Sequence, residues 1–389
     1  MSASLVPAAL SLAIWAYLLL ARGGFWRAAV RDRPSAPPAP GWPGPAVAAV
    51  IPARDEADVV GRAVASLLAQ DYGGAFEIVL VDDQSSDGTA EVAGRAAAEL
   101  GAGARLTVLS GRPLPDGWTG KLWAVKQGVD HLLARPSPPA FLLLSDADIA
   151  YAPRTLAALV AESEQERLVL NSRMAKLFCA RAAERALIPA FIFFFQMLYP
   201  FAWVNDPARR IAAAAGGSML LRREALQAAG GIEAIRGELI DDCALARRLK
   251  RQGPIRLALT DRVASLRPYG GIGDIRRMVA RSAYAQLRFS PLLLAGTVAG
   301  MALTYLAPPL LALFAAGPAR VLGIVGWAAM ALAYRPVLRF YRLSSLWGAA
   351  LPGIAALYLA FTLDSVWQHR RGRGGFWKGR AQAPRTEAT

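Results

Sequence analysis

The chain has 389 residues, of which 54% are hydrophobic and 19% charged, and its 44 Lys and Arg exceed its 29 Asp and Glu, giving a formal net charge of +15. Soluble domains usually contain about 25% charged residues, so this composition argues against an ordinary soluble monomer and against a disordered chain. Two cysteines and two histidines are too few for a disulfide framework or for a zinc site with the usual ligands. Catalytic groups must therefore come mostly from carboxylates.

The first apolar run, residues 5–21, is about long enough to cross a bilayer. A signal peptide would place basic residues before this run and a small-residue cleavage site after it, whereas here four arginines follow, at 22, 27, 31 and 33. We therefore expect residues 1–22 to form a retained membrane anchor whose carboxyl end faces the cytoplasm. Residues 23–45 form a basic and Pro-rich linker, because their prolines suit an extended spacer.

Residues 46–290 are predicted to form an α/β domain. Short apolar strands are expected at 46–52, 76–83, 105–110 and 140–148, with amphipathic helices at 59–70 and 89–100. Near-continuous apolar strands that alternate with helices predict a mostly parallel sheet covered on both faces. In such sheets ligands bind at the carboxyl ends of the strands, and polar residues follow several strands here.

The first two strands are followed by motifs that suit a ligand site. The first ends in IPARDE, which supplies Pro52, Arg54 and Glu56, and the second ends in VDDQSSDGT, which supplies Asp82 and Asp83. The second motif alone is equally consistent with an ordinary turn and helix cap.

Further along, Lys121 lies in a Gly-flanked loop before a helix, where a cation could meet a diphosphate or could be a plain surface lysine. Asp146 and Asp148 lie two residues apart at the end of an apolar strand, so they point to the same side of the chain. Carboxylates placed in this way suit a hard divalent cation that holds a diphosphate.

Residues 187–204 are apolar but borderline in length, and they contain two prolines and a glutamine. We expect an in-plane or groove-lining interfacial helix here and not a true span. Downstream, Gly216, Gly217 and Ser218 precede a strand, where small residues let a substrate approach closely; helix packing is the alternative. Asp241 and Asp242 begin a predicted helix and lie near its positive end.

Three apolar stretches follow, at 291–316, 321–334 and 346–367, and we expect residues 291–367 to form transmembrane segments. The middle stretch is short unless it continues through Arg335 to Tyr341. Three spans would put the basic tail, residues 368–389, outside the cell, whereas its composition favours the cytoplasm. A repeat of RGGFW, at 22–26 and again at 373–377, also favours a cytoplasmic tail, so the topology stays open.

The order and spacing of these motifs resemble the family 2 glycosyltransferases with the GT-A fold. That family shows P-A-R-x-E, then V-D-D-x-S-x-D-G-T, a G-K loop, D-A-D and a downstream acidic pair, and the resemblance covers roughly residues 46 to 290. More narrowly, the anchor, the insertion and the C-terminal apolar segments with their WKGR tail resemble the hopene-associated glycosyltransferase branch of bacterial hopanoid biosynthesis.

The resemblance implies a role for each motif. Pro52, Arg54 and Glu56 would lie along the nucleoside, Asp82 and Asp83 at the base, Lys121 at the diphosphate, Asp146 at the ribose, and Asp148 on Mg2+ or Mn2+. Asp242 would be the catalytic base, while Asp241 stands where Glu is commoner in the family. Processive members carry Q-x-x-R-W after the base, but residues 276–290 of this chain have no Trp that follows an Arg at that spacing, and Arg281, Gln286 and Arg288 are expected to play a related part at the diphosphate or the lipid surface. We therefore expect transfer of a single sugar with inversion at the anomeric carbon.

The sequence thus predicts a membrane-bound inverting glycosyltransferase that moves a sugar from a nucleotide-diphosphate donor to a lipid hydroxyl, in hopanoid biosynthesis. Two alternatives are a polyprenyl-phosphate or other glycolipid glycosyltransferase and a non-enzymatic membrane scaffold of a lipid pathway. Nucleic acid is not an expected partner, because the arginines flank apolar spans. Their placement favours anionic membrane lipids and a catalytic domain on the cytoplasmic face of a bacterial inner membrane.

Overall fold

The computed structural model describes residues 4–33, 42–372, 374–377 and 380–381. They form two compact units. The sheet unit comprises Val30–Phe178, Trp203–Arg267 and the segment from Phe376, and the helical unit comprises Met1–Ala29, Cys179–Ala202 and Pro268–Gly375. Residues 34–41 of the linker and residues 373, 378–379 and 382–389 of the basic tail lie outside the described residues.

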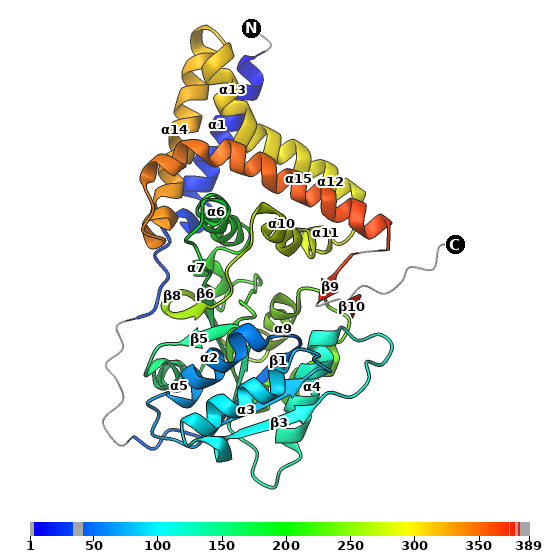
Figure 1. Ribbon diagram of the computed structural model, residues 1–389. Helices are drawn as coiled ribbons and strands as arrows, with labels where there is room; N and C mark the ends of the chain where they lie inside the picture. The colour runs from blue at the N-terminus through cyan, green and yellow to red at the C-terminus, as the bar shows by residue number, and fades with distance from the viewer. Residues whose placement is uncertain (1–3, 34–41, 373, 378–379, 382–389) are drawn as a thin grey trace. The chain divides into compact units, whose positions relative to one another are not determined.

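In the described part of the sheet unit, eight strands form one mixed sheet (Figure 1). From edge to edge the order is β3 (Leu106–Ser110), β2 (Phe76–Asp82), β1 (Val47–Ala53), β4 (Phe141–Ser145), β7 (Ser218–Arg222), β6 (Leu170–Lys176), β8 (Ile255–Ser265) and β5 (Ile149–Tyr151). Strands β3, β2, β1 and β4 are mutually parallel, β7 is antiparallel to β4 and β6, and β8 is parallel to β6 and antiparallel to β5. The prediction of a mostly parallel sheet is confirmed, although the fourth strand ends at Ser145 and not at 148.

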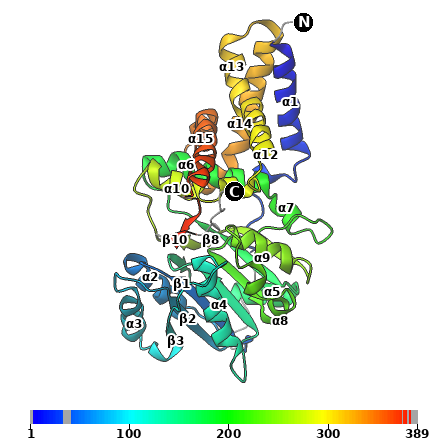
Figure 2. The same cartoon turned by 90° about the vertical axis from the view of Figure 1, so that its right-hand side faces the viewer.

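Helices cover both faces of this sheet because its central strands are apolar on both sides. The helices and 3-10 turns are α2 (Ala57–Leu68), α3 (Thr89–Glu99), η2 (Gly103–Arg105), α4 (Gly120–Leu133), α5 (Thr155–Gln165), α8 (Arg223–Ala228), η3 (Ile232–Ile235) and α9 (Asp241–Leu249). Alternate β1 residues, including Val47 and Ile51, join the core under α2 and α3. On the other face α4 packs so closely that a Cβ on Gly128 would lie 2.6 Å from the Val50 side chain. Figure 2 shows α2 and α3 on one side and α4 on the other.

The helical unit is built from long apolar helices. Its elements are α1 (Leu5–Leu20), η1 (Phe25–Arg27), α6 (Ala182–Leu198), α10 (Ile272–Ala280), α11 (Ala283–Gln286), α12 (Pro291–Met301), the π turn η4 (Ala302–Leu306), α13 (Ala307–Phe314), α14 (Gly317–Phe340), η5 (Ser345–Ala350) and α15 (Leu351–Arg370). Three short elements remain. They are the four-residue α7 (Phe201–Val204) and the strands β9 (Phe376–Trp377) and β10 (Arg380–Ala381), which form an antiparallel ladder.

Among the described residues, three helical stretches are long and apolar enough to cross a membrane. They are Pro291–Phe314, Gly317–Phe340 and Ser345–Arg370. The middle stretch continues through Arg335 to Phe340, so the longer of the two alternatives for this segment is the one found. The predicted N-terminal anchor is an apolar helix of 16 residues, shorter than the other three.

The predicted interfacial segment, 187–204, forms most of α6, which starts earlier at Ala182, and all of α7. Aromatic residues of α6 hold it in the helical unit. The Phe193 ring lies 5.4 Å from that of Tyr334, the Phe194 ring lies 5.0 Å from that of Tyr358, and the Tyr358 hydroxyl donates to the Leu187 carbonyl at 2.8 Å. The position of this helix relative to a bilayer stays a prediction.

Candidate active site

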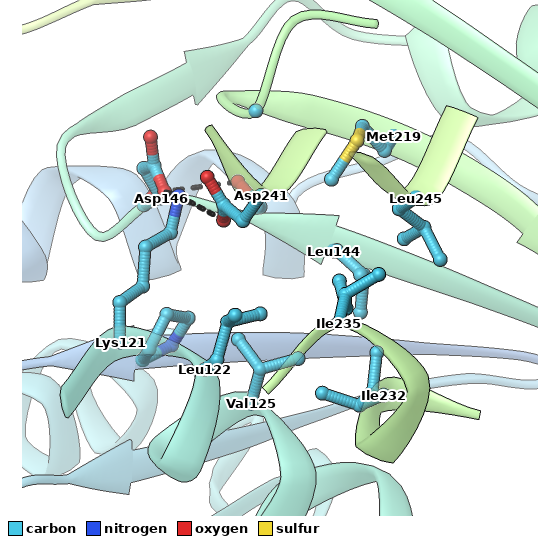
Figure 3. Close-up of a pocket in the computed structure, with 13 residues that line it drawn as sticks. Lys121, Leu122, Val125, Leu144, Asp146, Met219, Ile232, Ile235, Asp241 and Leu245 are labelled. Carbon is cyan, nitrogen blue, oxygen red and sulfur yellow. Dashed lines mark hydrogen bonds and ion pairs between the residues drawn. The ribbon is translucent and has the colours of Figure 1, made fainter. Parts of the chain in front are cut away.

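A pocket opens in the sheet unit where β1 and β4 end and where α4 and α9 begin. It holds about 320 Å³ of space, its mouth included. One side is charged and carries Lys121, Asp146 and Asp241, as Figure 3 shows. The other side is apolar and is lined by Leu122, Val125, Leu144, Met219, Ile232, Ile235 and Leu245. Three of the polar residues that the motifs singled out thus meet in one place from three separate segments.

Lys121 is the cation at the centre of this group. Thr119 caps α4 by accepting a hydrogen bond from the Leu122 amide at 3.4 Å, which places Lys121 in the first turn. The Lys121 Nζ lies 2.9 Å from Asp146 Oδ1 and 3.2 Å from Asp241 Oδ2. Burial alone would lower the pKa of Lys121, but the two carboxylates raise it well above its usual value. Lys121 therefore stays charged and joins the β4 end to the start of α9.

Asp242 lies beside this ion pair with both carboxylate oxygens engaged. Its Oδ2 accepts from the Gly216 amide at 2.9 Å and its Oδ1 accepts from the Cys243 amide at 2.6 Å. A Cβ on Gly216 would lie 3.3 Å from Lys121 Nζ and 3.5 Å from Asp242 Oδ2, so glycine leaves room for this approach. Burial and then Asp241 raise the pKa of Asp242 to about 6, against the opposing effect of Lys121. An oriented carboxylate with such a pKa is well suited to accept a proton near neutral pH.

Asp148 lies among polar groups from two other segments. Its Oδ2 accepts a hydrogen bond from Ser265 Oγ at 3.1 Å and lies 3.5 Å from Arg267 Nε, and Arg267 also pairs with Glu56. Burial and then Asp146 raise the pKa of Asp148 to about 6. Two crowded carboxylates offer oxygen ligands, and a divalent cation would relieve their repulsion, so these residues fit a hard metal ion.

Within the described part of the chain, no group of three or more His, Cys, Asp or Glu side chains could hold a metal by itself. A metal at Asp148 would therefore need further oxygen ligands from a substrate or from water. This requirement agrees with the small number of protein ligands that Mg2+ takes when it binds with a nucleotide phosphate.

Arg54 and the paired acids of the second strand form a separate group. Arg54 donates to the backbone oxygens of Asp83 and Gln84, and its Nη1 lies 3.9 Å from Asp83 Oδ2. Asp83 is fully buried, and Asp82 accepts from the Ser85 amide at 3.3 Å. Pro52, two residues before Arg54, lines the same pocket as Lys121 and Asp146, so the Arg54 group lies close to the pocket along the chain.

The rest of the VDDQSSDGT motif joins two loops. Ser85 Oγ accepts from the Asp55 amide at 3.0 Å, Thr89 Oγ1 accepts from the Glu56 amide at 2.8 Å, and Asp87 Oδ2 accepts from the Ala57 amide at 2.9 Å. These bonds fix the loop after β1 against the loop after β2, so this part of the motif has a clear structural role.

Of the remaining predicted residues, Gly216, Gly217 and Ser218 lie where the chain enters β7, and of these three Gly216 lines the pocket. Gln286 and Arg281 belong to the helical unit, and neither lines the pocket. The Gln286 amide lies 2.7 Å from the Tyr199 hydroxyl, and Arg281 is exposed.

Sequence reasoning missed two residues of this site, Arg267 and Tyr151. Arg267 contacts Glu56 across 211 residues of chain, which no local motif could reveal. Tyr151 follows the D-A-D motif by three residues, and its phenol lies 3.0 Å from Ser145 Oγ. The alternation of Ile149 and Tyr151 on one face of a short strand was the available signal.

Several solved structures are similar to this chain. Among solved structures, the mannosyltransferase PcManGT from Pyrobaculum calidifontis, in complex with GDP-Man and Mn2+, is 20% identical over 94% of this chain and 99% of that chain, with a TM-score of 0.56. S. aureus TarS 1-349 in complex with UDP-GlcNAc is 13% identical over 84% of this chain and 92% of that one, with a TM-score of 0.40. Glucosyl-3-phosphoglycerate synthase from Mycobacterium tuberculosis, in complex with Mn2+, UDP and glucosyl-3-phosphoglycerate, is 16% identical over 67% of this chain and 87% of that one, with a TM-score of 0.41.

The likeness to PcManGT shows a GT-A fold. Comparison with curated protein sequences gives no match. The model of the family described as glycosyltransferase like family 2 matches residues 43–264, more than half of the chain. The protein therefore belongs to glycosyltransferase-like family 2 and is a glycosyltransferase.

Proposed function

We propose that this glycosyltransferase moves a single sugar from a nucleotide-diphosphate sugar to the hydroxyl group of a membrane lipid, with inversion at the anomeric carbon. The observation that carries the proposal is the meeting of Lys121, Asp146 and Asp241 in one pocket, with the Asp242 carboxylate bonded to the amide of Gly216, which also lines that pocket. A cation beside a carboxylate with a raised pKa is what a displacement reaction of a diphosphate sugar needs.

Asp242 is the proposed base. It takes the proton of the acceptor hydroxyl as that oxygen attacks the anomeric carbon, and the bond from that carbon to the diphosphate oxygen breaks in the same step. The nucleoside diphosphate leaves with the bonding electron pair. Since one displacement inverts the anomeric carbon, an α-linked donor gives a β-linked product.

Lys121 is the proposed contact of the leaving diphosphate. Its ammonium group has three donors, two of which already face Asp146 and Asp241, so one remains for a phosphate oxygen. Asp146 is then proposed for the ribose, and Pro52, Arg54, Glu56, Asp82 and Asp83 for the nucleoside. When bound at Asp148, Mg2+ or Mn2+ would act as a Lewis acid that stabilises the negative charge of the leaving group.

The three apolar stretches in the helical unit support a lipid acceptor and a place in a membrane, for which we propose the cytoplasmic face of a bacterial inner membrane. Hopanoid is our first choice of acceptor, because the anchor, the insertion and the C-terminal segments resemble the hopene-associated branch. The alternative acceptors are a polyprenyl phosphate and another glycolipid. Family membership supports an enzyme over a scaffold.

Anionic lipids are the proposed partners of the arginine clusters, although some arginines also have structural roles. Arg22 donates to the Met197 carbonyl at 3.1 Å and to the Leu198 carbonyl at 3.4 Å, at the carboxyl end of α6. That end carries partial negative charge, so Arg22 stabilises the helix whether or not it also meets a phospholipid.

The test is sugar transfer by membranes that contain the full chain. Membranes are incubated with labelled GDP-mannose, UDP-glucose and UDP-GlcNAc in turn, and the lipid extract is separated into hopanoid, polyprenyl and other fractions. We expect label in one lipid fraction, with a β linkage by NMR. Release of the label by mild acid would identify the labelled product as a glycosyl phosphate and so favour the polyprenyl phosphate acceptor. An α linkage from these donors, or label only in water-soluble products, would overturn the proposal.

A further inference from the structure

The ladder between β4 and β7 ends next to residues that line the pocket. This antiparallel ladder runs from the pair Phe141 and Arg222 to the pair Ser145 and Ser218. The next residue along β4 is Asp146, and the residues before β7 are Gly216 and Gly217. Beyond the last ladder pair, something other than the ladder must fix the distance between these segments.

A buried phenol lies at this point. The Tyr151 hydroxyl lies 3.0 Å from Ser145 Oγ and 3.4 Å from the Gly217 carbonyl, and Ser145 Oγ lies 3.4 Å from the same carbonyl. The three groups can form a relay in which Tyr151 donates to Ser145 and Ser145 donates to the Gly217 carbonyl, although the Asp146 carbonyl, at 3.3 Å from Ser145 Oγ, is a second acceptor for the same proton. Tyr151 is 4% exposed, and burial raises its pKa to about 12, so the phenol keeps its proton.

The backbone of Tyr151 is itself held firmly. Its amide donates to Ser66 Oγ at 3.0 Å, and Tyr151 pairs with Val263 in the ladder of β5 and β8. Gly217 packs closely against β5, where a Cβ at this position would lie 3.1 Å from the Ile149 side chain. The phenol therefore joins a rigid strand to a closely packed turn.

Each end of the relay is one residue away from a group of the site. Ser145 precedes Asp146, which pairs with Lys121 at 2.9 Å. Gly217 follows Gly216, whose amide donates to Asp242 at 2.9 Å. We propose that the Tyr151 hydroxyl is a positioning group that couples the acidic end of β4 to the glycine turn that orients Asp242.

This inference rests on the proposed role of Asp242, and it predicts a specific defect in Tyr151→Phe. Loss of one relay hydrogen bond lets the Gly216 turn shift, and small misplacements of a catalytic group slow the chemical step. We expect kcat to fall by about 10-fold, with a change in donor KM of less than about 3-fold. The charged groups beside Asp242, Asp241 and Lys121, are unchanged in this variant.

The pH profile gives a second readout that a purely structural role would not move. The Gly216 amide stabilises the ionised form of Asp242, so a weaker bond raises the pKa of Asp242 above about 6. The acid limb of kcat in Tyr151→Phe should therefore move to higher pH.

The matched control is Tyr72→Phe, which removes another phenol hydroxyl of the sheet unit, one that donates to the Pro45 carbonyl at 2.5 Å. The full chain is assayed in detergent with the lipid fraction that membranes label as acceptor. Nucleotide release is measured with whichever of GDP-mannose, UDP-glucose and UDP-GlcNAc the wild type turns over. Tyr72→Phe should keep the wild-type kcat and acid limb even if its Tm falls as much as that of Tyr151→Phe.

A second variant, Ser145→Ala, tests the same relay if Tyr151→Phe does not fold. Because both substitutions break one relay, the double variant should be no slower than the slower single variant. A Tyr151→Phe or Ser145→Ala enzyme with wild-type kcat and an unmoved acid limb would overturn the inference. If Asp242→Asn also kept full turnover, the proposed base would be wrong as well, so the two failures are distinguishable.

Discussion

Asp242→Asn separates catalysis from stability at this site, because the same carboxylate is proposed to be the base and lies in surroundings that disfavour its charge. Its pKa rises from the usual 3.8 to about 6, first through burial and then through Asp241. Because the folded state disfavours the carboxylate, its contribution to stability is greatest below pH ~4 and is lost as the pH rises through about 6. At pH 7 the ionised group costs about 3 kcal/mol relative to a neutral one.

Asparagine removes this charge but cannot accept both amide hydrogen bonds. One of the bonds from Gly216 and Cys243 is lost, at a cost of about 1–3 kcal/mol. The two effects nearly cancel, so we expect the Tm of Asp242→Asn at pH 7 to lie within a few degrees of the wild type. Turnover should nevertheless fall by about 10²–10⁴-fold, because the proton acceptor is gone.

The assay is release of nucleotide from the donor by purified full chain, supplied with the lipid fraction that membranes label as acceptor and measured from pH 5 to pH 8, with Tm measured in parallel. The wild type should lose about 10-fold in kcat for each pH unit well below about 6. Asp71→Asn is the control, because Asp71 is 74% exposed in an ion pair with Arg154. Turnover by folded Asp242→Asn above a tenth of the wild type, or a wild-type acid limb near pH 4, would refute the reasoning.

Three more predictions follow from the same geometry. Lys121→Met should raise the KM of the nucleotide sugar at least 10-fold, and it should move the acid limb of kcat to higher pH because Lys121 lowers the pKa of Asp242. An unchanged donor KM in steady-state assays would exclude Lys121 from the diphosphate. Arg267→Ala should bind Mn2+ a few-fold more tightly than the wild type in calorimetry without nucleotide, because Arg267 competes with a metal for the Asp148 carboxylate, and Asp148→Asn should lose this binding. Equal Mn2+ affinity in the wild type and both variants would place the metal elsewhere. Gly128→Leu should lower the Tm by more than about 10 °C, since the new Cβ would lie within 3.1 Å of the Val50 and Val81 side chains. A Tm equal to that of the wild type in thermal unfolding would contradict this packing.

The order of the local elements could be predicted from the sequence. Residues 46–52 and 76–83 are apolar runs between turn residues, and they form β1 and β2 nearly as expected. The C-terminal apolar stretches likewise form long helices. Strand and helix formation in these segments follows from the local spacing of apolar residues, which the sequence displays directly.

The sequence also indicated that Lys121, Asp146 and Asp241 would share a site, since residues at the carboxyl ends of parallel strands and at neighbouring helix starts lie close together. Their arrangement could not be predicted. The motifs suggested a lysine free for a diphosphate, but the structure places its ammonium group within 3.2 Å of two carboxylates.

The contacts of Arg267 with Glu56 and of Tyr151 with Ser145 and Gly217 were decided by tertiary structure alone. They depend on β7 inserting antiparallel to β4 and on β8 returning beside β5, and local periodicity does not encode which strands become neighbours. The sequence by itself thus determined the kinds of groups at this site and the family of the enzyme, whereas strand order determined which group orients which.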